Sequence, residues 1–187
     1  MSSHYTKNDV IVSRDCPAVS VPYGQPVTIE KGCEATITQK LGGSYTVMVE
    51  GNLYRVEGID GDALGFEPEE AARFEPEGPV TAEFVENSAW EQLATCYDPE
   101  IPVDIVNLGL VYGCKVAPGT TEGKFVVDVQ MTLTAPGCGM GTFIADEARN
   151  KILAIPGVEN ARVDVVWDPP WSREMISEPA RLQMGLL

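Results

Sequence analysis

The chain has 187 residues, of which 44% are hydrophobic, and 13 Lys and Arg residues against 28 Asp and Glu residues give a formal net charge of −15. This hydrophobic share suffices for a core. The negative charge repels phosphate backbones and anionic lipid, which argues against nucleic-acid or membrane binding. The same charge favours a basic protein or a metal cation as partner. No apolar run reaches the roughly 20 residues that span a bilayer, and the first ten residues lack an apolar signal core, so we expect a cytoplasmic protein.

Residues from about 19 to 60 predict a small antiparallel β unit, because short runs of β-branched residues alternate with polar ones. Two-residue turns at Gly42-Gly43 and Gly51-Asn52 separate the runs. Since a lone hairpin is marginal in water, we expect three to five strands that curl on themselves or dock on the rest of the chain. The expected strands are residues 27–29, 35–41, 44–50 and 53–56.

A segment rich in proline and glutamate, residues 65–80, follows this unit and is expected to be a linker, with a short helical turn over 68–73. The sequence therefore predicts two domains. Residues 1–80 form the small β domain with its linker, and residues 81–187 form the second domain.

The second domain is predicted to run in the order helix, strand, strand, helix, strand. The first two strands can form a hairpin, and the third can pair in parallel after a helical crossover. We therefore expect a three-stranded mixed sheet with helices on one face, which makes the whole chain α+β. The expected elements are helix 81–97, strands 110–116 and 125–133, helix 141–155, strand 161–167 and a tail helix over 178–184.

The chain has five cysteines and one histidine, His4. An odd number of cysteines without an export signal argues against a disulfide framework, and no C-x-x-C spacing suggests a structural zinc site. Cys–His or Ser–His catalysis lacks a well-placed imidazole base. Four cysteines read as structural from their turn, helix or strand contexts: Cys16, Cys33, Cys96 and Cys114.

Cys138 is different, because glycines flank it in a loop between a predicted strand and a predicted helix. Unpaired N–H groups at a helix N-terminus carry partial positive charge and favour the thiolate, which binds soft metals. The Thr134 hydroxyl could point into the same loop. Alternatively, the glycines only make a tight turn and Cys138 is a small buried apolar residue.

Asp98 and Glu100 form a second polar feature, one to three residues past the end of the predicted first helix. Their carboxylates could face a metal or a partner, or the segment could simply be a helix stop followed by a turn. Trp167 and Trp171 are expected to be packing anchors that pin the C-terminal tail, whereas an exposed Trp171 would indicate a contact surface.

Three motifs in order resemble the metal–sulfur cluster assembly domain shared by SufT and PaaD proteins and by cytosolic iron–sulfur assembly targeting factors. They are DPEIPVDIVNLGLVYG (98–113), MTLTAPGCGMG (131–141) and VWDPPWSREMIS (166–177). The first half, with DCPAVSVPYGQPVTIEKG (15–32), ITQKLGGSYTV (37–47) and GIDGDALG (58–65), resembles the amino-terminal extension of bacterial SufT proteins.

The resemblance implies an auxiliary factor in iron–sulfur cluster assembly or transfer, rather than a turnover enzyme. The partners would be scaffold or carrier proteins and client apoproteins, and the cargo would be iron or a labile iron–sulfur cluster. The motif residues fall on Asp98, Glu100, Thr134 and Cys138. Many relatives have proline after the motif cysteine, and Gly139 here removes a rigid element and frees an N–H group.

Three hypotheses follow. In the first, Cys138 binds iron or a transient cluster, Asp98 or Glu100 supplies an oxygen ligand, a proton acceptor or a docking charge, and two chains can share one cluster in a homo-oligomer. In the second, the chain is an adaptor that never holds iron and uses its acidic surface and Trp171. In the third, it is a cysteine-dependent hydrolase or transferase in which Asp98 replaces the histidine base.

Overall fold

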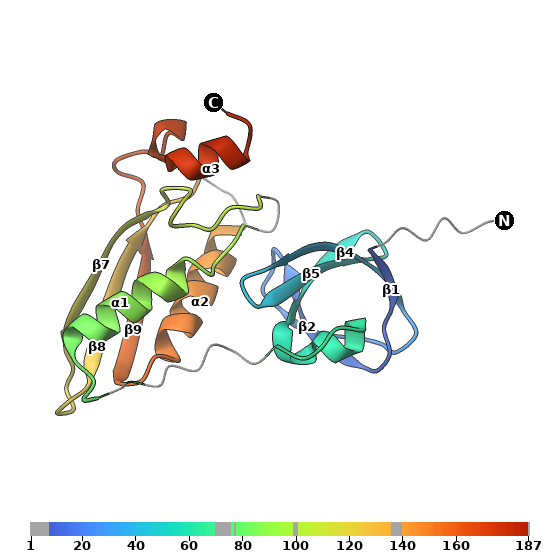
Figure 1. Ribbon diagram of the computed structural model, residues 1–187, viewed down its shortest axis with the longest axis horizontal. Helices are drawn as coiled ribbons and strands as arrows, with labels where there is room; N and C mark the ends of the chain where they lie inside the picture. The colour runs from blue at the N-terminus through green and yellow to red at the C-terminus, as the bar shows by residue number, and fades with distance from the viewer. Residues whose placement is uncertain (1–7, 70–75, 77, 99–100, 136–139, 187) are drawn as a thin grey trace. The chain divides into compact units, whose positions relative to one another are not determined.

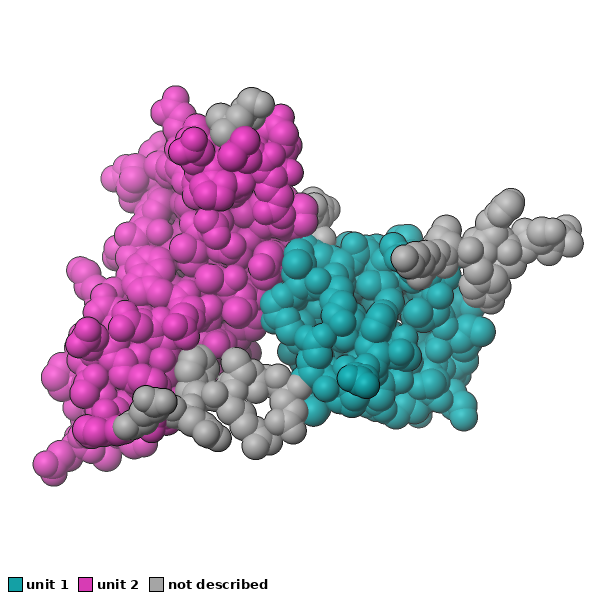
Figure 2. Space-filling view, viewed as in Figure 1, with its two compact units in different colours: residues 1–73 teal, residues 74–187 magenta. Residues whose placement is uncertain are grey.

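A computed structural model describes residues 8–69, 76, 78–98, 101–135 and 140–186 of the chain. The chain divides into two compact units, residues 1–73 and 74–187 (Figure 2). The predicted linker stays a prediction, because most of 70–77 lies outside the described residues. In the part of the chain that the structure describes, no helix is both long and apolar enough to cross a bilayer.

The first unit is a six-stranded antiparallel sheet that curls around its own core (Figure 1). The strand order across the sheet is β1-β4-β5-β6-β2-β3. A 3₁₀ helix, η1 (Gly58–Leu64), follows the last strand. The strands are β1 (Asp9–Ile11), β2 (Cys16–Val21), β3 (Pro26–Ile29), β4 (Glu34–Leu41), β5 (Ser44–Val49) and β6 (Asn52–Glu57).

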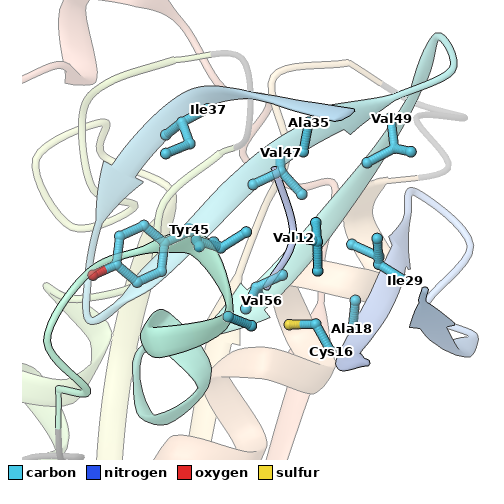
Figure 3. Close-up of a cluster of buried hydrophobic side chains, with 12 residues drawn as sticks. Val12, Cys16, Ala18, Ile29, Ala35, Ile37, Tyr45, Val47, Val49 and Val56 are labelled. Atoms are coloured by element: carbon cyan, nitrogen blue, oxygen red, sulfur yellow. The ribbon is translucent and has the colours of Figure 1, made fainter. Parts of the chain in front are cut away.

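Alternation along β5 explains why this sheet closes on a core. Tyr45 and Val47 are fully buried and Val49 is 8% exposed, while Met48 between them is 40% exposed. Their side chains belong to one buried cluster with Val12, which follows β1, with Cys16 of β2 and with other apolar residues of the unit (Figure 3). The curled sheet thus gives a small unit the apolar burial that a flat hairpin lacks.

Two of the six strands, β1 and β2, were not expected from the sequence. The first has three residues, too few for alternation to show, and the second contains Pro17, which lowers the strand signal. Cys16 begins β2 and is fully buried, which agrees with a structural role for this thiol.

The second unit has the predicted topology and confirms the α+β class. A three-stranded sheet, ordered β7-β8-β9, pairs β7 with β8 in antiparallel and β8 with β9 in parallel register. The long helices α1 and α2 cover one face of this sheet (Figure 1). The elements are α1 (Ala82–Leu93), β7 (Val111–Pro118), β8 (Phe125–Met131), α2 (Met140–Leu153), β9 (Val158–Val165), η2 (Arg173–Met175) and α3 (Glu178–Gln183).

The core of this unit lies between the helices and the sheet. Val127, Val129 and Met131 of β8 are fully buried. Each helix contributes an apolar stripe, and an i,i+4 ion pair forms on α2 between Glu147 and Lys151 at 3.1 Å. The buried helix residues are Val85, Ala89, Leu93, Ile144, Ala148 and Ile152.

Helix α1 ends at Leu93, four residues before the predicted end. The Thr95 hydroxyl donates a 2.7 Å hydrogen bond to the Gln92 carbonyl, and the Thr95 N–H donates to the same oxygen. This local bonding competes with continuation of the helix. The prediction relied on Asp98-Pro99 as the stop and missed the earlier signal.

Glu159, at the start of β9, holds the β7–β8 turn. Its carboxylate accepts hydrogen bonds from the Thr120 hydroxyl and from the Thr121 N–H, the latter at 2.8 Å. These bonds, the one from the Thr120 hydroxyl first among them, lower the pKa of Glu159 from 4.5 to about 2.

Because the pKa of Glu159 is lower in the folded chain than in the unfolded one, the stabilisation is complete above about pH 4.5 and is lost as the pH falls toward 2. We therefore expect the urea midpoint of the wild type to fall more steeply over this range than that of Glu159→Gln. Glu122→Gln, an exposed acid of the same turn, is the matched control and should follow the wild type. Parallel curves for the wild type and Glu159→Gln would contradict the assignment.

Candidate functional site

The described parts of the three family-like motifs meet at one end of the second unit's sheet. The start of β7 and the ends of β8 and β9 lie at this end, as their pairing directions require. Two backbone hydrogen bonds join the segments: the Thr132 N–H donates to the Leu110 carbonyl at 2.7 Å, and the Val166 N–H donates to the Met131 carbonyl at 2.8 Å. The loop that leads to Cys138 therefore leaves the sheet between the other two motifs.

Asp104 organises the loop before β7. It is 8% exposed, and its Oδ1 accepts hydrogen bonds from the backbone N–H groups of Val106 and Asn107, at 3.0 and 2.9 Å. Its Oδ2 accepts a third bond from the Asn107 side-chain amide at 2.8 Å. One buried carboxylate thus satisfies three donors and fixes the turn over residues 104–109.

The C-terminal segment holds this loop from the outside. The Trp171 indole N–H donates to the Leu108 carbonyl at 2.8 Å, and the Ser177 hydroxyl donates to Asn107 Oδ1 at 2.8 Å. The Gln183 amide donates to the Pro102 carbonyl at 2.9 Å. The loop geometry therefore depends on residues about 70 positions later in the chain.

Gly109 is where the loop and the tail approach most closely. Its φ is +70°, in the left-handed region, and a Cβ at this position would overlap the backbone carbonyl of Met175. Only glycine meets both conditions, which explains the glycine in this motif.

The structure places two of the five predicted site residues. Thr134 is exposed just after β8, and Asp98 is half-buried. Asp98 lies five residues past Leu93, so the expected distance of one to three residues past the helix end is wrong for it. The other three, Glu100, Cys138 and Gly139, lie outside the described residues, and the proposed ligand set stays a prediction. Among the described side chains, no three His, Cys, Asp or Glu residues form a metal-binding cluster.

Thr132 adds a polar atom that the sequence analysis did not single out. The residue is fully buried, and its hydroxyl has no hydrogen-bond partner within the described ranges of the chain. Buried hydroxyls nearly always form a hydrogen bond, so the Thr132 hydroxyl is unusual in this respect. It lies two residues before Thr134, in the segment that leads to Cys138.

Three of the four other cysteines are buried and are poor ligands where they lie. Cys16, Cys96 and Cys114 are buried. Burial raises the pKa of Cys114 to about 11, and burial also raises the pKa of Cys16. Cys33 is half-buried beside the core of the first unit. A metal-binding thiolate is therefore not expected from the buried three.

The two tryptophans of the third motif behave differently. Trp171 is half-buried and pins the tail through its bond to the Leu108 carbonyl, as expected. Trp167 is 46% exposed, so the expectation that it is a packing anchor is wrong. It lies two residues past the end of β9.

Sequence reasoning missed the residues that build the loop: Asp104, Asn107 and Ser177. Asp104 had a local signal, since Asp side chains often accept a hydrogen bond from the backbone N–H two residues later. The bond from Ser177 to Asn107 joins residues 70 positions apart and had no local signal.

Comparison with known proteins places this arrangement in a family. The model of the iron-sulfur cluster assembly protein family matches residues 86–165. A protein of Porphyromonas gingivalis named Fe-S protein maturation auxiliary factor is 42% identical over 95 residues, which are 51% of this chain and 86% of that protein. The Fe-S protein maturation auxiliary factor SufT of Staphylococcus aureus is 42% identical over 89 residues, which are 48% of this chain and 96% of that protein.

A crystal structure of a domain of unknown function from Bacillus anthracis is 39% identical, covers 57% of this chain and 96% of its own, and gives a TM-score of 0.47. The family model does not reach the first unit, so the resemblance of residues 15–65 to a SufT extension stays a prediction. Through residues 86–165, which contain the first two motifs, the chain belongs to the iron-sulfur cluster assembly protein family.

Proposed function

We propose that this chain is an auxiliary factor in iron–sulfur cluster assembly or transfer to client apoproteins, without catalytic turnover of its own. The observation that carries the proposal is the meeting of the three motifs at one end of the sheet, where the Thr132 N–H donates to the Leu110 carbonyl and the Val166 N–H donates to the Met131 carbonyl. Two relatives with 42% identity that are named maturation auxiliary factors support the same role.

In this proposal Cys138 supplies a thiolate for iron or a labile cluster as cargo. Helix α2 begins at Met140, two residues later, so N–H groups of its first turn are available to a negative sulfur nearby. Asp98 or Glu100 would supply an oxygen ligand, a proton acceptor or a docking charge. Thr134 would donate a hydroxyl, and Gly139 would leave an N–H group that proline lacks.

A single thiolate per chain suits a carrier, because weak binding permits release. Two chains could share one cluster, with external thiols or a client protein completing the iron coordination. The scaffold and client proteins would then be attracted by the charge of −15 if they are basic.

The test is anaerobic reconstitution with ferrous iron and sulfide, followed by iron and sulfide quantitation and visible absorption. We expect the wild type to take up both and Cys138→Ser to lose nearly all uptake, because a hydroxyl is a poor ligand for iron in a sulfide cluster. Cys33→Ser is the matched control, since Cys33 is a half-buried thiol of the first unit. It should take up iron and sulfide as the wild type does.

Equal absorbance from the wild type and Cys138→Ser would remove Cys138 from the ligand set. A wild type that retains scaffold or client proteins but no iron would favour the adaptor function, which the exposed Trp167 supports as a contact residue. A covalent thioester trapped on Cys138 would instead indicate the hydrolase or transferase reaction.

A further inference from the structure

The second unit has an open groove beside the end of its sheet where the described parts of the three motifs meet. Its volume is about 550 Å³, and the first residues of β7, the end of β8 and the segment after β9 form it. Gln130 is exposed and alternates with the buried Val129 and Met131, so the groove lies on the sheet face away from α1 and α2. Its apolar lining comes from Val111, Tyr112, Val166, Pro169 and Met175.

Hydrogen bonds hold the walls of the groove in place. The Tyr112 hydroxyl donates to the Pro169 carbonyl at 2.7 Å and lies 3.8 Å from the Met175 sulfur. The bond from Trp171 to the Leu108 carbonyl and the close approach of Gly109 to Met175 fix the same segment. A surface shaped before binding loses less conformational entropy when a partner binds.

The described residues that line the groove include one acid and no base. Asp168 is the one ionisable acid among the eight described residues that line it, and none of the eight is Lys, Arg or His. Asp164 is exposed and pairs in register with Gln130, so it lies on the same face beside the groove. An anionic ligand would be repelled here, whereas a cationic group would be attracted.

The exposure of the rim favours a polypeptide over a small molecule. Met175, which lines the groove, is 36% exposed, so the apolar surface of the groove is open to solvent. Small-molecule sites enclose most of their ligand, which an open groove of this kind does not. An extended segment can place one side chain in the groove and its neighbours on the rim.

We propose that this groove docks an extended segment of a partner protein in which a Lys or Arg side chain lies beside apolar residues. The apolar residues would contact Val111, Val166 and Met175, and the cation would pair with Asp168, with Asp164 adding attraction. The proposal goes beyond the role of Cys138, because it requires no metal.

The test is a ¹⁵N NMR titration of the full chain with an acetylated, amidated pentapeptide that alternates leucine and arginine. We expect saturable shifts centred on Val111, Tyr112, Gln130 and Val166. The matching peptide with glutamate in place of arginine should cause none. Asp168→Asn should raise Kd about two- to fivefold, the effect of one exposed ion pair.

Two further variants separate docking from general attraction to an acidic protein. Asp146→Asn removes the same charge from an exposed position on α2 and should leave Kd unchanged. Gln130→Lys places a cation in the groove and should abolish binding, while its unchanged NMR spectrum elsewhere shows that the chain is folded. Equal effects of Asp168→Asn and Asp146→Asn, shifts centred elsewhere, or no saturable shifts would each overturn the proposal.

The titration is repeated on Cys138→Ser without metal. Unchanged peptide binding there is the expected result, and it keeps the groove separate from the proposed role in cluster assembly. Loss of peptide binding in this variant would overturn the claim that the groove requires no metal ligand.

Discussion

Replacement of Gly109 with alanine is expected to lower the free energy of unfolding of the second unit by about 2–4 kcal/mol. Two costs combine: alanine at a φ of +70° is strained, and its Cβ would overlap the Met175 carbonyl. The tail that carries Met175 must move, and the bond from Trp171 to the Leu108 carbonyl should weaken with it. Urea unfolding followed by tryptophan fluorescence measures the effect.

All three tryptophans, Trp90, Trp167 and Trp171, lie in the second unit, so this fluorescence reports on that unit alone. Gly123→Ala is the matched control, because Gly123 has a φ of +74° but no described atom lies within 4 Å of the position that its Cβ would take. It should cost only about 1–2 kcal/mol, the strain by itself. Equal losses in the two variants would show that the contact between Gly109 and Met175 does not matter.

Replacement of Asp104 with alanine is expected to cost about 2–4 kcal/mol, again in the second unit. The change leaves the N–H groups of Val106 and Asn107 and the Asn107 amide without their acceptor in a site that is 8% exposed. We also expect the NMR signals of residues 104–109 to shift or broaden, since the carboxylate fixes their turn. Urea unfolding by the same fluorescence gives the free energy.

Asp104→Asn should be intermediate, because its amide oxygen can still accept from the two backbone N–H groups. Its NH₂ group would then face the donor on Asn107, so one bond is lost and one repulsion is gained. Asp164→Ala, on the exposed face of β9, should change the free energy of unfolding by less than about 0.5 kcal/mol. A loss in Asp104→Ala no larger than in Asp164→Ala would show that the turn does not depend on the carboxylate.

Much of the fold could be predicted because its signals are local. Alternation over residues 125–133 predicted β8 and its buried face, although the strand ends at Met131, and the spacing of Ile144, Ala148 and Ile152 predicted α2. Parallel pairing of β9 followed from the length of the crossover, because such connections are strongly restricted.

The strands β1 and β2 could not be predicted, because pairing with distant strands defines them rather than their own residues. Asp9 pairs with Thr36, and Val19 pairs with Arg55, across the sheet. Similarly, the end of α1 at Leu93 depends on one Thr95 hydroxyl, a weaker local signal than the proline six residues past Leu93.

For the candidate site, the sequence indicated which residues could act there but not the hydrogen bonds that hold the neighbouring loop. Cys138, Asp98, Glu100 and Thr134 follow from chemistry and from resemblance. The bonds that hold the neighbouring loop, from Trp171, Ser177 and Gln183, join segments 63 to 81 residues apart. Such contacts arise only when the sheet has brought the segments together, so no spacing rule could have indicated them.

The hydrogen bonds from the C-terminal segment to the loop before β7 have a consequence for synthesis on the ribosome. A nascent chain that has not yet reached Ser177 and Gln183 lacks two of the bonds that hold Asn107 and the Pro102 carbonyl. The buried core of the first unit, by contrast, consists of described residues between 12 and 64. During translation, the first unit can therefore fold before the ribosome has made the residues that hold the loop before β7.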